Sequence, residues 1–159
     1  SEAAAELRKT AHNMMPEILL QEGLVEAVGH FCRTVARNSG TDIHFQTTGP
    51  LRPFDTHMEL AIYRVVQELV HNILKHAAAT EAIVQMGFSD ELFDLSIEDN
   101  GIGMPEKIRC GVGLSSMRER IDEIGGRMSI RHGNPGVILI ASVPTHPEIR
   151  AIRDLARAS

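Results

Sequence analysis

A helical pattern from Tyr63 to Ala77 carries three polar side chains whose types suit phosphate chemistry. Glu68, Asn72 and Lys75 fall within roughly 60° of one another at about 100° per residue, on an otherwise apolar helix. A carboxylate can accept a proton, an amide oxygen can bind Mg²⁺ and an ammonium group can neutralise phosphate. The solvated face of an amphipathic helix looks the same. The stripe is therefore a candidate site whose interpretation depends on the rest of the chain.

Two further segments have features that suit a nucleotide. Asp99 ends a strand pattern and precedes the glycine-rich turn at 100–104, where a carboxylate beside accessible backbone suits a purine amine. Gly111 and Gly113 precede a helix, and amide groups at a helix N-terminus favour phosphate. Each motif alone is weak, because a DNG sequence is more often an ordinary turn. Their order after the Glu68 helix favours a nucleotide site.

The elements that must position these residues alternate between helical and strand periodicity. We expect helices over 2–13, from Pro16 to Asn38, from about 55 to 77 and over 114–124, and strands over 41–47, 82–88, 92–98, 128–131 and 137–143. This order predicts an α+β fold, a two-layer sandwich whose mixed sheet is covered by helices on one face. The segment 137–143 is apolar on both faces, which favours a place inside the sheet.

Composition excludes several classes of protein. The 159 residues are 43% hydrophobic, which suits one globular unit, and a net charge of -5 with scattered Lys and Arg argues against a nucleic-acid surface. Cys32 and Cys110 are widely separated and lack zinc-site spacing, so we expect free thiols and a cytoplasmic location. We find neither a membrane-spanning apolar run nor a secretory signal pattern. Because the chain begins inside a helical pattern, we interpret it as a piece of a longer protein.

The ordered segments QELVHNILKHA, EDNGIGM, GVGLSSMRERI, GGRMSI and VILIASVP resemble the ATP-binding catalytic domain of bacterial sensor histidine kinases. These are GHKL ATPases with the Bergerat fold, so the resemblance implies a mixed, mostly antiparallel sheet. It is strongest to the subfamily of nitrate and antibiotic-stress sensors that act with LuxR-type response regulators. It divides the chain into the end of a second dimerisation helix with its linker (1–15), the catalytic domain (16–146) and a C-terminal tail (147–159).

Carried over by position, the resemblance implies that Asn72 binds Mg²⁺ and that Glu68 positions or accepts a proton in phosphoryl transfer. Asp99 would accept a hydrogen bond from the adenine amine. The other implied nucleotide contacts are Lys75, His76, Gly111, Val112, Gly113, Leu114 and Ser115 at the phosphates, and Gly101, Ile102, Gly103 and Met104 at the adenine pocket. Residues between Gly103 and Gly111 would form a short ATP lid, poorly ordered without nucleotide.

The implied function is the binding of Mg-ATP and donation of its γ-phosphoryl group to a histidine on a dimerisation domain that these residues do not include. A response regulator would then receive the group. The fragment would be mostly monomeric and unable to phosphorylate itself, whereas the parent would be a homodimer, either soluble or anchored to a membrane. Val137 departs from the family pattern, which usually has a threonine there. Three alternatives stay open: another GHKL ATPase, an anti-sigma-type serine kinase, or a non-catalytic nucleotide-sensing module.

Overall fold

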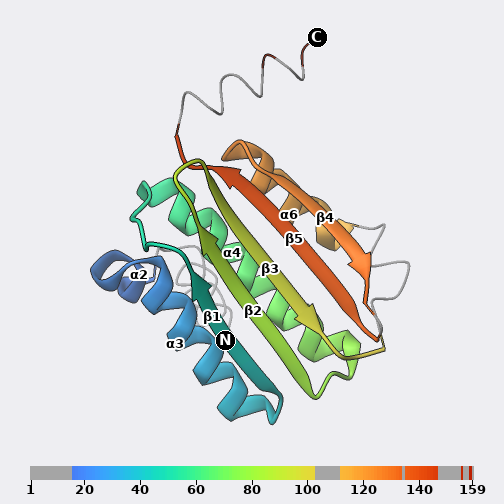
Figure 1. Cartoon of the computed structure of the whole chain (residues 1–159). Helices are drawn as coiled ribbons and strands as arrows, with labels where there is room; N and C mark the ends of the chain where they lie inside the picture. Colours follow the sequence, from blue (N-terminus) through green and yellow to red (C-terminus); the bar gives the residue numbers. More distant parts are fainter. Residues whose placement is uncertain (1–15, 103–111, 134, 147–154, 156–157, 159) are drawn as a thin grey trace, which may run out of the picture.

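The computed structural model describes residues 16–102, 112–133, 135–146, 155 and 158, and leaves the side chains of residues 76, 77, 112 and 113 undescribed. Within these residues, helices and strands follow one another in the expected order (Figure 1). The elements are α2 (Glu17–Glu22), α3 (Leu24–Ser39), β1 (Asp42–Thr48), α4 (Thr56–Asn72), the π-helix η1 (Ile73–Ala77), β2 (Glu81–Phe88), β3 (Leu92–Asp99), α6 (Val112–Glu123), β4 (Arg127–His132) and β5 (Val137–Pro144).

The five strands form one sheet in the order β1-β2-β3-β5-β4. Strands β1 and β2 pair in parallel, and the other three pairings are antiparallel, so the predicted mixed, mostly antiparallel sheet is confirmed. Strand β5 lies between β3 and β4, as its apolar sequence indicated. Buried and less buried positions alternate along β2, β3 and β5, because successive side chains point to opposite faces.

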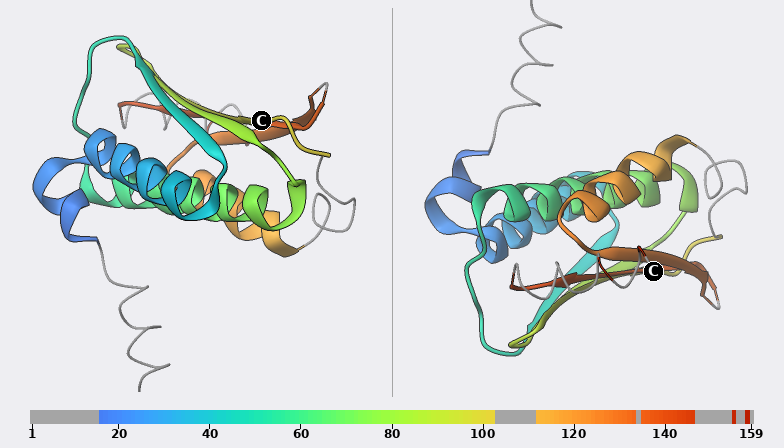
Figure 2. Two further views of the ribbon diagram at one scale, coloured as in Figure 1. Left: turned by 90° about the horizontal axis from the view of Figure 1, so that it is seen from below. Right: turned by 90° about the horizontal axis from the view of Figure 1, so that it is seen from above.

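Helices α3, α4 and α6 cover one face of the sheet (Figure 2). Their apolar sides pack against the buried positions of the strands to form one hydrophobic core. Helix α4 buries one side in this core, because its apolar residues recur at helical spacing. The buried residues of this side include Ile62, Val65, Val66 and Leu69. The predicted two-layer arrangement is therefore correct. Among the described residues, no helix has the length and apolar character needed to span a bilayer.

The second expected helix, from Pro16 to Asn38, differs from the structure. The sequence pattern predicted one helix from Pro16 to Asn38, whereas α2 and α3 are separated at Gly23. Gly23 has φ 86° and ψ 179°, a backbone conformation that glycine adopts readily and a helix does not contain. The helical spacing of apolar residues continues across Gly23, so the sequence pattern gave no indication of the break. The expected helix over 2–13 and most of the C-terminal tail lie outside the described residues.

Candidate functional site

Two polar residues of the predicted stripe, Glu68 and Asn72, lie in the last turns of α4. Both side chains are partly buried, and with His71 and Ser116 they line a pocket of about 290 Å³. The Ser116 hydroxyl of α6 donates a hydrogen bond to Glu68 Oε2 at 3.3 Å. The structure therefore brings the end of α4 and the beginning of α6 together, although 48 residues separate Glu68 from Ser116.

Lys75 does not continue the stripe in the way the sequence suggested. The α-helix ends at Asn72, and Lys75 lies in η1, where a π-helix takes more residues per turn than an α-helix. The rotation of about 100° per residue, from which we predicted that the three side chains share one face, therefore applies only as far as Asn72. The side chain of Lys75 is exposed. His76 belongs to the same π-turn, and its side chain lies outside the described part of the chain.

Asp99 is a buried carboxyl group at the end of β3, with 4% of its surface exposed. Its Oδ1 accepts a hydrogen bond from the backbone N–H of Gly101 at 2.8 Å, and the backbone N–H of Val137 also donates to the carboxylate. Burial raises the pKa of Asp99 above its ordinary value, against the lowering effect of these two hydrogen bonds. Val137 thus supplies a backbone donor to Asp99, while its side chain is itself buried.

Gly136 allows the turn before β5 to pass directly against Asp99. Its φ is +93°, and a Cβ at this position would lie 2.7 Å from the carbonyl carbon of Asp99 and closer still to its oxygen. Any residue other than glycine would therefore displace one of the two segments. Figure 1 shows the end of β3 and the beginning of β5 side by side at one end of the sheet.

Asn100 connects the Asp99 turn to the segment that follows α4 and η1. Its Oδ1 accepts hydrogen bonds from the backbone N–H groups of Thr80 and Glu81, each at 3.0 Å, and its Nδ2 donates to Thr80 Oγ1 at 2.9 Å. The chain before these residues contains Ala78, a non-glycine residue in the left-handed region with φ 50°. The end of the α4–η1 unit is thus held next to the carboxyl end of β3.

The remaining predicted residues divide into four groups. Gly101 is buried in the turn, whereas Ile102 is 81% exposed. Leu114 faces the core and Ser115 is exposed, so of these two only Ser115 has a side chain near solvent. Val112 and Gly113 are the first residues of α6 and offer backbone amides. Gly103, Met104, Gly111 and the proposed lid between them lie outside the described residues.

Three residues that build this site were not singled out from the sequence: Ser116, Asn100 and Gly136. Ser116 carries no local signal, because its partner is on another helix. Asn100 and Gly136 stand in turn sequences, where their types are already explained by local backbone geometry. For Gly136, the additional reason is its approach to Asp99, which only the structure shows.

The oxygen atoms at the end of α4 suit a metal ion that arrives with a nucleotide. Protein Mg²⁺ sites of this kind use one or two side-chain oxygens, because phosphate and water complete the coordination. Asn72 and Glu68 line one pocket and offer an amide and a carboxylate oxygen. In the described part of the chain, no group of three or more His, Cys, Asp or Glu side chains is arranged to hold a metal by itself. The donor set therefore fits nucleotide-borne Mg²⁺.

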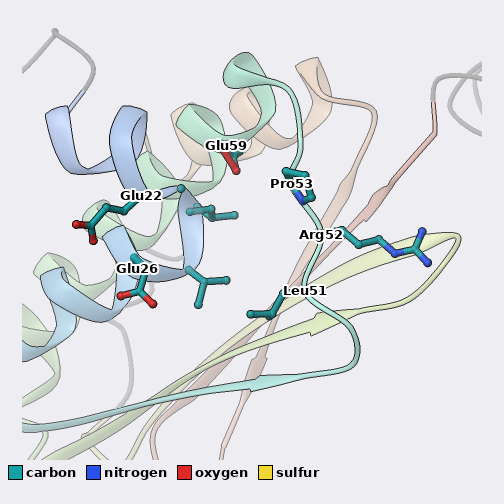
Figure 3. Close-up of a pocket in the computed structure, with 9 residues that line it drawn as sticks. Glu22, Glu26, Leu51, Arg52, Pro53 and Glu59 are labelled. Atoms are coloured by element: carbon teal, nitrogen blue, oxygen red, sulfur yellow. The ribbon is translucent and has the colours of Figure 1, made fainter.

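A larger pocket of about 360 Å³ lies elsewhere, between the start of α3 and the connection at 51–53 (Figure 3). Its half-buried Glu59 accepts hydrogen bonds from the backbone N–H groups of Phe54 and Leu24. Burial raises the pKa of Glu59, against these hydrogen bonds. Glu59 and Asn72 are separated along α4 by about 20 Å at 1.5 Å per residue. This pocket is therefore separate from the candidate site, and Glu59 ties the starts of two helices together.

Comparison with known proteins gives consistent matches. Residues 57–147 match the family model described as Histidine kinase-, DNA gyrase B-, and HSP90-like ATPase. The signal transduction histidine-protein kinase/phosphatase DegS of Brevibacillus brevis is 31% identical over 147 residues, which cover 91% of this chain and 38% of that protein. The sensor histidine kinase NarS of Mycobacterium tuberculosis is 33% identical over 130 residues, covering 78% of this chain and 30% of that protein. The chain thus spans about a third of the length of these curated relatives.

Solved structures agree on the fold. The histidine kinase domain of the blue-light activated histidine kinase from Erythrobacter litoralis superposes with a TM-score of 0.64. The match covers 81% of this chain and 68% of that one at 20% sequence identity. At this identity the likeness establishes the arrangement of helices and strands.

Proposed function

The chain belongs to the family of histidine kinase-, DNA gyrase B-, and HSP90-like ATPases, and from this premise we propose that it binds Mg-ATP and donates the γ-phosphoryl group to a histidine outside its 159 residues. The chain is the ATP-binding catalytic domain of a sensor histidine kinase. Two sets of contacts support the finer proposal. Ser116 of α6 donates a hydrogen bond to Glu68 near the end of α4, and Asn100, the residue after Asp99, accepts hydrogen bonds from Thr80 and Glu81, which follow the α4–η1 unit.

In this proposal the end of α4 holds the metal-bound phosphates and β3 holds the base. Asn72 provides the amide oxygen for Mg²⁺, and Asp99 accepts a hydrogen bond from the adenine amine. Backbone amides of the first turn of α6 are directed at the phosphates. The full set of proposed nucleotide contacts consists of Asn72, Lys75, His76, Asp99, Gly101, Ile102, Gly103, Met104, Gly111, Val112, Gly113, Leu114 and Ser115.

The transfer step needs little covalent work from the protein. A nitrogen of the acceptor imidazole attacks the γ-phosphorus, the bond from that phosphorus to the β,γ-bridging oxygen breaks, and ADP leaves with the electron pair. Glu68 accepts the proton that the imidazole ring gives up. Asn72 would hold Mg²⁺, which would supply charge neutralisation at the phosphates. Lys75 approaches the same charge from solvent, so that catalysis consists mainly of positioning and charge compensation.

The relatives also suggest the surroundings of this domain. The named relatives are sensor and signal-transduction histidine kinases, so we place the acceptor histidine on the parent's own dimerisation domain and a response regulator downstream. The parent would then act as a homodimer on the cytoplasmic side, and the isolated 159-residue chain would bind nucleotide as a monomer.

Isothermal titration calorimetry with ADP and ATP, each with and without Mg²⁺, tests the proposal. Asn72→Ala should lower affinity in the presence of Mg²⁺ at least about tenfold and leave the metal-free affinity nearly unchanged, because a metal oxygen ligand is lost. Asn38→Ala, at an exposed asparagine near the end of α3, is the matched control.

Two results would decide against the kinase proposal. If nucleotide affinity is the same with and without Mg²⁺ and is unchanged by the Asn72 substitution, the result would favour a non-catalytic nucleotide-sensing module. That second candidate has some support from Val137, which provides no side-chain hydroxyl beside Asp99. Absence of any nucleotide binding by the wild-type chain would refute both.

A further inference from the structure

A direct side-chain hydrogen bond joins α4 to α6 inside the candidate site. Ser116 Oγ donates to Glu68 Oε2 at 3.3 Å, and both side chains are partly buried. Ser116 is the fifth residue of α6, within the helical turns that begin at Val112. Both partners line the same pocket as Asn72. The serine thus contacts the carboxylate from the helix whose first turn is proposed to bind phosphate.

The geometry on α4 places this carboxylate next to the proposed metal ligand. Glu68 and Asn72 are four residues apart, so their Cβ atoms are neighbours at about 5–6 Å on one face of the helix. A glutamate side chain has three rotatable bonds and needs an external partner to hold one orientation. Ser116 donates to one carboxylate oxygen, Oε2, and the other oxygen, Oε1, is a second acceptor on the same group.

We infer that Ser116 is a positioning residue: its hydroxyl holds Glu68 so that Oε1 is directed at the water molecules around the Mg²⁺ ion that Asn72 binds. The inference depends on the proposed function. Mg²⁺ gives up its water reluctantly and usually keeps several molecules when it binds through one or two protein oxygens. A carboxylate near Asn72 can accept hydrogen bonds from such water, and outer partners of this kind contribute strongly to metal affinity.

This role gives α6 two connections to the bound nucleotide. Its first backbone amides face the phosphates, and Ser116 reaches the metal's water through Glu68. A displacement of α6 would therefore weaken the magnesium contribution to binding as well as the phosphate contacts. The metal-free affinity depends on the phosphate and base contacts alone, which allows the two effects to be measured separately.

The test is a double-mutant cycle on the 159-residue chain, read by calorimetry. The measured quantity is the ratio of ADP affinity with Mg²⁺ to ADP affinity without it. Ser116→Ala should lower this ratio about 3- to 10-fold, as expected for one hydrogen bond to a partly solvated carboxylate. Ser116→Thr, which keeps the hydroxyl, should restore most of it. In a Glu68→Gln background, Ser116→Ala should add little, because the carboxylate it orients is gone.

Two controls separate positioning from loss of structure. Ser129→Ala, at an exposed serine of β4, should leave the ratio unchanged. Urea unfolding of each variant shows whether the fold is retained.

An equal loss of affinity with and without Mg²⁺ in Ser116→Ala would indicate a purely structural role and overturn the inference, as would full additivity with Glu68→Gln. If wild-type ADP binding is enhanced by Mg²⁺ but Ser116→Ala keeps the full enhancement, the inference fails and the proposed function stands. If the wild-type chain binds no nucleotide, the proposed function itself fails, and the inference with it.

Discussion

The approach of Gly136 to Asp99 gives the sharpest prediction. Gly136→Ala introduces a Cβ 2.7 Å from the carbonyl carbon of Asp99, at a residue whose φ is +93°. The positive φ alone costs about 1–2 kcal/mol for a residue with a side chain. Forcing two backbone segments apart adds about 1–3 kcal/mol. We therefore expect a loss of about 2–5 kcal/mol in the free energy of unfolding, a large share of the 5–15 kcal/mol typical of a domain.

Two other glycines separate the components of this loss. Gly40→Ala has the same kind of φ, +76°, but no atom within 4 Å of the added Cβ, so it should cost only the conformational part, about 1–2 kcal/mol. Gly49→Ala combines φ +82° with a Cβ 3.0 Å from the carbonyl carbon of Phe88 and closer to its oxygen. It should be as costly as Gly136→Ala, at the opposite end of β2 from Asp99.

Urea unfolding followed by circular dichroism measures stability, and calorimetry with Mg-ADP measures binding by the folded protein. Gly136→Ala should lose at least about tenfold in affinity because Asp99 is displaced, whereas Gly49→Ala should bind normally when folded. The reasoning is refuted if Gly136→Ala is no less stable than Gly40→Ala. Equal nucleotide affinity in the Gly136→Ala and Gly49→Ala variants would refute the placement of Asp99 in the site.

Burial raises the pKa of the Cys32 thiol to about 12, so iodoacetamide should label this thiol only after the protein unfolds. Mass spectrometry measures the labelling, and equal labelling rates with and without urea would contradict the prediction. The raised pKa of Glu59 means that the folded chain binds this proton more tightly than the unfolded chain, so stability falls as pH rises above 4.5 through the folded pKa. Glu59→Gln should therefore gain stability relative to wild type with rising pH, and parallel urea midpoints in the two proteins would exclude that linkage. Asn100→Ala should lower the free energy of unfolding by about 1–2 kcal/mol, because the hydrogen bonds from the Thr80 and Glu81 backbones to Oδ1 are lost. Asn100→Asp keeps an acceptor oxygen and should lose less. Equal urea midpoints for the two variants would count against the role of Oδ1.

The sequence predicted the parts of the fold that repeat locally. The apolar spacing of α4 and the alternation along β3 follow from burial of one face, which leaves a record in neighbouring residues. The break at Gly23 escaped notice because one residue outside the helical conformation leaves the surrounding apolar spacing nearly unchanged.

The candidate site was predictable where a residue's type is itself informative. Asp99 and Asn72 stand in motifs, which made them candidates from the sequence, and in the structure Asp99 ends β3 while Asn72 ends α4. Ser116 is different, because a serine on a helix has many ordinary explanations and its partner lies 48 residues away. The π-turn after Asn72 also left no periodic signature, since five residues are too few to define a period.

The position of β3 has a consequence for how this protein could change. It is the middle strand of five, flanked on both sides by antiparallel partners, and Asp99 is its last residue. The groups proposed to contact the phosphates belong instead to α4, η1 and the beginning of α6, which lie outside the sheet. In the proposed site, substitutions that alter the phosphate contacts would therefore fall on helices and leave the strand pairing of β3 intact, whereas a substitution at Asp99 would fall on the middle strand of the sheet.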